Sequence, residues 1–266
     1  MILSSISIYP IKSTAALDLQ SATIDARGLM HDRRWMIVDP EGRFLTGRQL
    51  ARMVLIRALP AGDGLVLQAP SMPDRIVAAP ASNDGERLPV TVWDDVVDAA
   101  CADAVDDAWL SEFLGRPVRL VAMDAQSVRT VESKPSSAFD DDVSFADGFP
   151  FLAISQASLD GLNARLAAPI SMRRFRPNLV IAGCDPHAED GWHRIRIGGV
   201  EFEAIKPCTR CVFTTVDSEL GVRDPSGEPL RTLKSYRRSD EGITFGMNLV
   251  ARGRGRVCVG DRVELC

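Results

Sequence analysis

The sequence is poor in cysteine, in long hydrophobic runs and in targeting signals, and each scarcity excludes a class of protein. Six cysteines are spread irregularly over 266 residues, unlike the dense cysteines of a small secreted disulfide scaffold. No stretch approaches the roughly 18 uninterrupted apolar residues of a membrane-spanning helix. The start, MILSSISIYPIKS, lacks the basic region and apolar run of a signal peptide. We therefore expect a cytoplasmic protein with reduced thiols and no membrane partner.

A basic excess is missing as well. Asp and Glu total 36 against 31 Lys and Arg, which gives a formal charge of −5, whereas nucleic-acid binders usually carry an excess of positive charge. We therefore expect no nucleic-acid partner. The sequence is 45% hydrophobic and 25% charged, an ordinary globular composition with enough apolar material for one or two domains. It contains no internal repeat and no low-complexity tract.

Short β-like runs bounded by turn residues dominate the chain and predict a mixed α/β, predominantly β fold. Two segments predict helices: 102–116, which ends near Gly115, and 155–167, with Ser155 as N-cap. Evenly spaced strands with few helices favour a small closed or nearly closed β-barrel. The polar segment 124–148 predicts a loop or an interdomain connection. Strands are expected at 2–9, 33–39, 43–49, 53–59, 64–69, 88–93 and 118–124, and again in five runs from 178 onward, with a tight hairpin turn at 259–261.

The segment KPCTRCVFTTVD contains the most distinctive cysteines, Cys208 and Cys211. A structural zinc site normally has four ligands, but no second CxxC or HxxxH motif is present and the three histidines are isolated. A thioredoxin-like dithiol opens a helix, whereas CVFTTVD is rich in β-branched residues and predicts a strand that begins at the cysteine pair. Two buried thiols, or ligands for another metal, remain as alternatives.

Basic and hydrogen-bonding residues elsewhere form a pattern suited to holding a small anion. Arg33 and Arg34 lie on opposite faces if their segment is a strand, so one of them points inward. Arg176 and Asn178 are two apart and share a face if extended. Taken singly, each is an ordinary surface residue. The candidate set is Lys12, Ser13, Arg33, Arg176, Asn178 and Arg210.

Five motifs in one order, IYPIKS, DRRWMIVD, TGRQ, FRPNLVI and KPCTRCVFTTVD with a following LKSYR, span almost the whole chain. Together they resemble MOSC-domain proteins of the amidoxime-reducing component type. This resemblance implies an N-terminal β-rich domain (the MOSC_N domain) packed on a C-terminal MOSC β-barrel. The expected partition is 1–122 for the first domain, 123–148 for a connecting segment and 149–266 for the MOSC domain. The implied cofactor is molybdenum bound to molybdopterin.

The resemblance also assigns roles to individual residues. Cys211 matches the catalytic cysteine that ligates molybdenum, and Cys208 is its neighbour. A soft thiolate suits this metal, and charge-assisted bonds suit the pterin phosphate. Asp147 matches an acid near the metal and is the candidate proton carrier; the next residues, Gly148 and Phe149, depart from the small hydroxyl residues of the family. Lys12, Ser13 and Arg33 match positions that hold the phosphate, and Arg176, Asn178 and Arg210 match further cofactor contacts.

The resemblance implies reduction of small N-hydroxylated compounds, such as amidoximes, hydroxylamines and N-hydroxylated bases. The electrons are expected from a separate reductase of flavin or ferredoxin type, because the sequence shows no C-x₄-C-x₂-C iron–sulfur pattern. The alternative is a non-catalytic carrier of the molybdenum cofactor or of sulfur. No pyridoxal-phosphate desulfurase domain is recognisable, which weakens the sulfur version. A β-domain with a sensory or binding role is a third hypothesis.

Overall fold

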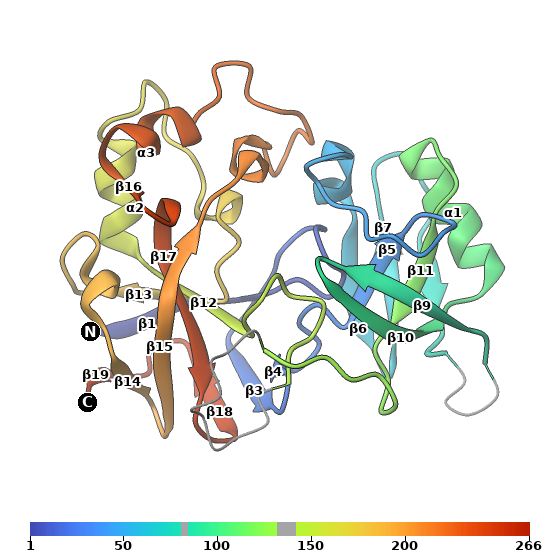
Figure 1. Cartoon of the computed structure of the whole chain (residues 1–266), viewed down its shortest axis with the longest axis horizontal. Helices are drawn as coiled ribbons and strands as arrows, with labels where there is room; N and C mark the ends of the chain where they lie inside the picture. Colours follow the sequence, from blue (N-terminus) through green and yellow to red (C-terminus); the bar gives the residue numbers. More distant parts are fainter. Residues whose placement is uncertain (81–84, 132–141) are drawn as a thin grey trace.

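The computed structural model describes residues 1–80, 85–131 and 142–266, and they form two lobes (Figure 1). One lobe contains both chain termini and is built around a nine-stranded sheet. In spatial order its strands are β19 (Val263–Leu265), β14 (Arg194–Ile197), β15 (Val200–Thr209), β17 (Gly242–Ala251), β12 (Phe151–Ser155), β13 (Leu179–Ala182), β1 (Ile2–Ile8) and β2 (Leu17–Leu19), with β16 (Arg238–Ser239) paired to β17.

The first residues of the chain close this sheet into a barrel. The Leu3 N–H donates to the Asp261 carbonyl and the Val263 N–H donates to the Met1 carbonyl, both at 2.9 Å. These bonds join β1, which lies next to the edge strand β2, to the segment that leads into β19 at the opposite edge of the sheet. A small sheet of β18 (Gly255–Cys258), β3 (Ser21–Asp25) and β4 (Gly28–Leu29) lies in the same lobe. Residues from both ends of the sequence therefore build the barrel predicted from the sequence.

The second lobe holds two smaller sheets and the longest helix (Figure 1). Its core includes Trp109, Leu110 and Phe113 of the helix, packed on the strands. The partition of the chain at residues 122 and 148 stays a prediction, and residues 132–141 of the expected connection lie outside the described residues. The strands are β5 (Trp35–Val38), β11 (Arg119–Ala122), β10 (Asp95–Cys101) and β9 (Arg87–Val92) in one sheet, and β6 (Arg57–Ala61), β7 (Gly64–Gln68) and β8 (Arg75–Val77) in the other.

Both predicted helices are present, with the expected boundaries to within a few residues. The Ser155 hydroxyl accepts from the Ser158 N–H at 3.0 Å and so caps the helix that follows. Gly115, at φ +70°, ends the other helix in the left-handed conformation that glycine tolerates best. The helices are α1 (Ala104–Leu114), α2 (Gln156–Asn163) and α3 (Leu230–Tyr236), with short 3₁₀ turns η1 (Ala51–Leu55), η2 (Met172–Arg174), η3 (Ala188–Gly191) and η4 (Val212–Thr215).

The strand predicted from Cys211 onward is wrong. Residues 212–215 form η4 instead, because two threonine hydroxyls bond back to the chain: Thr214 Oγ1 donates to the Cys211 carbonyl at 3.0 Å and Thr215 Oγ1 donates to the Val212 carbonyl at 2.7 Å. Such local bonds satisfy carbonyls that a strand would offer to a neighbour. The cysteine pair therefore spans the end of β15 and the entry to a 3₁₀ turn.

Three other sequence predictions also fail. Residues 43–49 form no strand, because the Thr46 N–H and hydroxyl both donate to Gln49 Oε1 at 2.9 Å and fold the segment into a turn. The run 53–59 begins in η1 and only its end enters β6. The segment 259–261 is not a hairpin, because β18 pairs with β3 while β19 pairs with β14. No helix of the described residues is long and apolar enough to cross a membrane.

Candidate functional site

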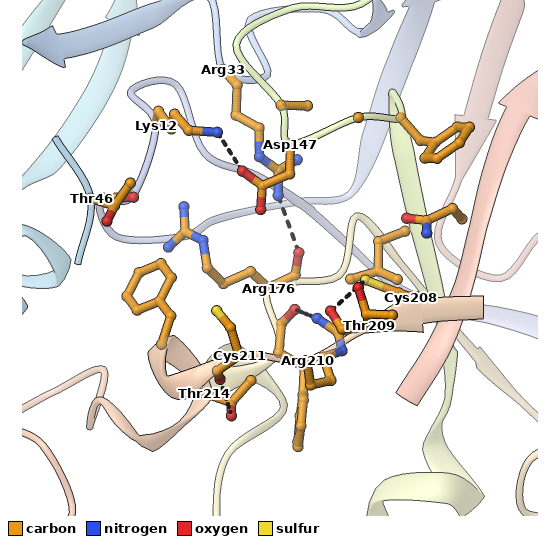
Figure 2. Close-up of a pocket in the computed structure, with 18 of the residues that line it drawn as sticks. Lys12, Arg33, Thr46, Asp147, Arg176, Cys208, Thr209, Arg210, Cys211 and Thr214 are labelled. Carbon is orange, nitrogen blue, oxygen red and sulfur yellow. Dashed lines mark hydrogen bonds and ion pairs between the residues drawn. The ribbon is translucent and has the colours of Figure 1, made fainter. Parts of the chain in front are cut away.

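One pocket gathers residues from both lobes, and Figure 2 shows its centre. Lys12, Arg33 and Asp147 lie on one side, Arg210 and Cys211 lie on the opposite side, and Arg176 reaches between them. All eight residues singled out from the sequence line this pocket, although their separate roles stay predictions. They are Lys12, Ser13, Arg33, Asp147, Arg176, Asn178, Arg210 and Cys211.

The residues differ in exposure, which divides the pocket into two parts. Lys12 and Ser13 are 4% exposed and Asn178 is 1% exposed, whereas the Asp147 side chain is 79% exposed and Cys211 is also exposed. We call the first part the floor: Lys12, Ser13, Arg33, Asn178 and the guanidinium of Arg176. We call the second part the mouth: Arg48, Trp93, Asp147 and Cys211.

The loop after β1 carries Lys12 and Ser13 and is tied to the second lobe. The Lys12 N–H donates to the Trp35 carbonyl at 2.8 Å, and the Trp35 N–H donates to the Pro10 carbonyl at 3.1 Å. Ser13 has φ +69°, a left-handed conformation uncommon for residues other than glycine. Among the described residues, its hydroxyl has no hydrogen-bond partner. The loop therefore presents a cation and an unengaged hydroxyl to the same space.

Lys12 and Asp147 form an ion pair of 2.5 Å between floor and mouth. Burial lowers the pKa of Lys12 to about 8, and Asp147 only partly offsets that effect. Desolvation alone would raise the pKa of Asp147, but the charge and hydrogen bond of Lys12 and the charge of Arg33 hold it well below its usual range. Lys12 also donates to the Phe145 carbonyl at 2.8 Å. Two of its three N–H groups are thus used, and one is left for an anion.

Arg129, outside the pocket, fixes the segment that carries Asp147. Its guanidinium donates to the Ser144 carbonyl at 2.8 Å, the Ala146 carbonyl at 2.5 Å and the Asp147 carbonyl at 3.1 Å. It also forms a 2.7 Å ion pair with Asp95. Because Arg129 is 5% exposed, these bonds form in a place where unmet carbonyls would be costly.

Arg33 and Arg176 lie against Tyr9, with guanidinium carbons 4.6 and 4.0 Å from its ring centre. Arg33 pairs with the buried Asp32 at 2.5 Å. Arg176 Nη1 donates to the Thr14 carbonyl at 2.5 Å, but Nη2 is buried without a partner among the described residues. Burial lowers the pKa of Arg176 to about 10. An unsatisfied buried guanidinium nitrogen of this kind is suited to receive an anionic oxygen.

Arg33 and Arg34 have different surroundings, although the residue pattern alone did not show which of them faces the pocket. Both precede β5, and Arg33 has φ +50°. Arg33 lines the pocket, where its Nη1 donates to Asn178 Oδ1 at 3.1 Å. Arg34 pairs with Asp25 at 2.6 Å and does not line it. Asn178 also accepts from the Leu152 N–H at 3.2 Å, so it locks Arg33 onto the barrel.

Arg210 holds the cysteine segment against the barrel. Its guanidinium donates to the Phe245 carbonyl at 2.8 and 2.6 Å and to the Phe175 carbonyl at 3.0 Å. Its described bonds are therefore structural, although it lines the pocket. These contacts fix the residue immediately before Cys211.

The two cysteines of the CxxC segment have different surroundings. Both line the pocket, but Cys211 is exposed, whereas Cys208 is half-buried and packs against the cluster that contains Phe175 and Phe245. Burial raises the pKa of the Cys208 thiol, which favours its neutral form. All six cysteines are free thiols, and among the described residues no three His, Cys, Asp or Glu side chains gather into a metal site. Cys211 is thus the more exposed sulfur of the pair.

Sequence reasoning missed Arg48 and Trp93, which also line the pocket. The Trp93 Nε1–H donates to Asp147 Oδ1 at 3.4 Å, and the Arg48 guanidinium lies 4.5 Å from the Trp93 ring centre. Arg48 belongs to the TGRQ motif, which was noted only as part of a resemblance. Nothing local in the sequence marks Trp93, because its place depends on the pairing of β9 with β10.

Comparison with known proteins agrees with this architecture. Residues 1–117 match the MOSC N-terminal beta barrel domain, and residues 140–264 match the MOSC domain. The chain is 36% identical to mitochondrial amidoxime-reducing component 1 of Homo sapiens over 97% of this chain and 81% of that protein. It is 33% identical to mitochondrial amidoxime reducing component 2 of Homo sapiens over 96% of this chain and 81% of that protein.

Relatives from other vertebrates show the same similarity, for example component 1 of Danio rerio at 36% identity over 98% of this chain and 84% of that protein. The fold, the order of the pocket-forming motifs and the two family matches agree. The chain belongs to the family of MOSC-domain proteins that contains the amidoxime-reducing components.

Proposed function

We propose that this protein is a molybdenum-cofactor-dependent reductase of small N-hydroxylated compounds. The proposal is supported by family membership and by a pocket that places an accessible thiol, Cys211, opposite a cluster of buried cations. The observation that carries it is the buried Nη2 of Arg176, which has no partner among the described residues and belongs to a side chain that lines the same pocket as that thiol.

The residues of the pocket fit a molybdopterin phosphate and a thiolate-bound metal. The free N–H of Lys12, the unengaged Ser13 hydroxyl and Arg176 Nη2 are three unsatisfied donors for one anionic group. Arg33 and Asn178 brace one another beside them. Cys211 is the proposed protein ligand of molybdenum, since soft thiolates suit such a metal. When bound, the cofactor supplies the two-electron redox chemistry.

For an amidoxime, the overall reaction consumes two electrons and two protons, breaks the N–O bond, and yields an amidine and water. Asp147 is the proposed proton carrier. Because Lys12 holds its pKa low, Asp147 is ionised near neutral pH, so it would hold a proton only briefly during transfer from solvent to the substrate. Its exposure at the mouth allows solvent contact, and Trp93 and Arg129 fix its position. The electrons come from a separate reductase; its flavin or ferredoxin type and the cytoplasmic location stay predictions.

Substitution of Cys211 beside its matched neighbour tests the proposal. In a host supplied with molybdate, we expect Cys211→Ala to lose at least about tenfold of the bound molybdenum and all benzamidoxime reduction with a viologen donor. Cys208→Ala should keep most of both, because Cys208 packs against the barrel core. Equal molybdenum in the Cys211 variant and the unmodified protein would contradict the assignment. A protein that keeps the cofactor, reduces nothing and donates the cofactor to an apo-enzyme would be the carrier.

A further inference from the structure

Arg48 carries an unused charge at the mouth of the pocket, whereas the other pocket cations are paired, bonded to the backbone or, like Arg176, placed at the floor. Lys12, Arg33 and Arg174 each pair with a carboxylate, at 2.5, 2.5 and 2.9 Å. Arg210 is bound to backbone carbonyls. Within the part of the chain that the structure describes, Arg48 forms no ion pair, and its side chain makes a single long hydrogen bond, from Nε to Thr46 Oγ1 at 3.4 Å.

The aromatic partner of Arg48 leaves the donors of its guanidinium accessible. The Arg48 guanidinium lies 4.5 Å from the Trp93 ring centre, and Trp93 in turn lies 5.2 Å from Phe44. A stacked guanidinium uses its face on the ring and keeps the N–H groups of its edge for a planar, bidentate acceptor. Trp93 is 44% exposed and has φ +57°, a strained conformation for a bulky residue, and such strain clusters at functional sites.

The segment that carries Arg48 is fixed beside the accessible thiol. Gly47 lies so close to the Phe213 ring that an added Cβ would meet Phe213 Cε2 at 2.1 Å. Phe213 belongs to η4, directly after Cys211. The Arg48 carbonyl accepts from Arg223 Nη2. The backbone that carries Arg48 is therefore held beside the turn that follows the proposed metal ligand, and its guanidinium lies on Trp93.

We infer that Arg48 and Trp93 form a substrate-recognition site, so that the preferred substrates are planar N-hydroxylated compounds that carry a carboxylate or another anionic group. The ring of such a substrate stacks at Trp93 and its anion pairs with Arg48, while the N-hydroxyl group faces Cys211 and Asp147. The inference rests on the proposed function, because it concerns the substrate of the same pocket.

Binding is measurable without turnover. Trp93 is 44% exposed, whereas Trp35, Trp109 and Trp192 are 4–7% exposed, so quenching of fluorescence by a bound ligand reports mainly on Trp93. We expect 4-carboxybenzamidoxime to bind the cofactor-loaded protein about tenfold more tightly than benzamidoxime, and Arg48→Met to abolish that preference. High salt should weaken the preference. Arg52→Met is the matched control, because Arg52 also stacks on an aromatic ring, Phe113 at 4.6 Å, but does not line the pocket.

Turnover gives a second readout. The ratio of kcat/KM for the carboxylated and neutral substrates should fall about tenfold in Arg48→Met, mainly through KM, and stay constant in Arg52→Met. Equal binding of both ligands to the unmodified protein would overturn the inference, as would loss of molybdenum in Arg48→Met, which would assign Arg48 to the cofactor. A carboxylate preference in binding without any reductase activity would support the recognition site and contradict the proposed function instead.

Discussion

The floor and the mouth of the pocket are built by opposite means. At the floor, side chains such as Lys12 and Asn178 are almost fully buried, and most of their polar atoms are already bonded within the protein. At the mouth, Cys211, Trp93 and Asp147 are exposed. Buried donors that are already held in place suit a tightly bound cofactor with a fixed charge, because they need no reorganisation when it binds. Exposed groups on the rim suit a substrate and product that exchange with solvent.

The same contrast explains why the two parts use charge differently. Each floor cation is placed by hydrogen bonds or by contact with an aromatic ring, and Lys12, Ser13 and Arg176, which keep unused donors, line the same pocket. The mouth has an exposed carboxylate, that of Asp147, and a guanidinium without an ion pair among the described residues, that of Arg48. The first is suited to a proton or a cationic group and the second to an anionic group. We therefore expect changes at the floor to affect cofactor retention and changes at the mouth to affect substrate choice and turnover.

Among the variants considered, replacement of Arg176 should reduce cofactor retention at the floor most strongly. A charge-assisted hydrogen bond contributes about 1.5–3 kcal/mol, so Arg176→Met should reduce the fraction of protein that retains molybdopterin through gel filtration by about tenfold or more. Arg176→Lys should retain part of it. The control is Arg173→Met, since Arg173 is half-exposed and pairs with Asp18 outside this pocket. Undiminished retention in Arg176→Met would show that the unsatisfied Nη2 has no role in holding the cofactor.

The pKa of Lys12 predicts a pH dependence that is specific to the floor. Lys12 is charged below a pKa of about 8 and neutral above it, and an anion binds the charged form. The affinity of the cofactor-free protein for sulfate, which keeps its charge over this range, should therefore fall about tenfold between pH 7 and pH 9. Calorimetry measures this sulfate affinity at each pH. Lys12→Met should bind weakly with a flat profile, and Lys234→Met, on α3, should keep the fall. A flat profile in the unmodified protein would refute the assignment.

Gly47→Ala tests how far the two parts are independent, with the smallest expected effect on cofactor binding. The added methyl must displace the Phe213 ring, and overpacking of this kind lowers the free energy of unfolding by about 1–3 kcal/mol. Denaturant titration measures the loss, and Gly253→Ala is the control because no atom lies within 4 Å of its added Cβ. We expect sulfate affinity to stay within about twofold. A larger fall would show that mouth and floor move together.

Much of the fold and of the candidate site followed from local patterns. Ser155 marked a helix start through its cap, and short β-like runs bounded by turn residues marked most strands of the barrel. Residues 211–217 were mistaken for a strand because β-branched threonines favour strands in general, while here Thr214 and Thr215 bond to their own chain. Arg48 was missed as a pocket residue because Trp93, which it contacts, and Phe213, which lies against Gly47, are distant in sequence.

The sequence alone determined the β-rich class, the family and eight of the residues that line the pocket, since these depend on residue types and short spacings. Only the tertiary structure decided that Arg33 and not Arg34 enters the pocket, that Cys211 is exposed while Cys208 packs against the core, and that the first strand closes the barrel. The physical reason is that burial and hydrogen-bond partners arise from contacts between distant segments, which no local pattern encodes.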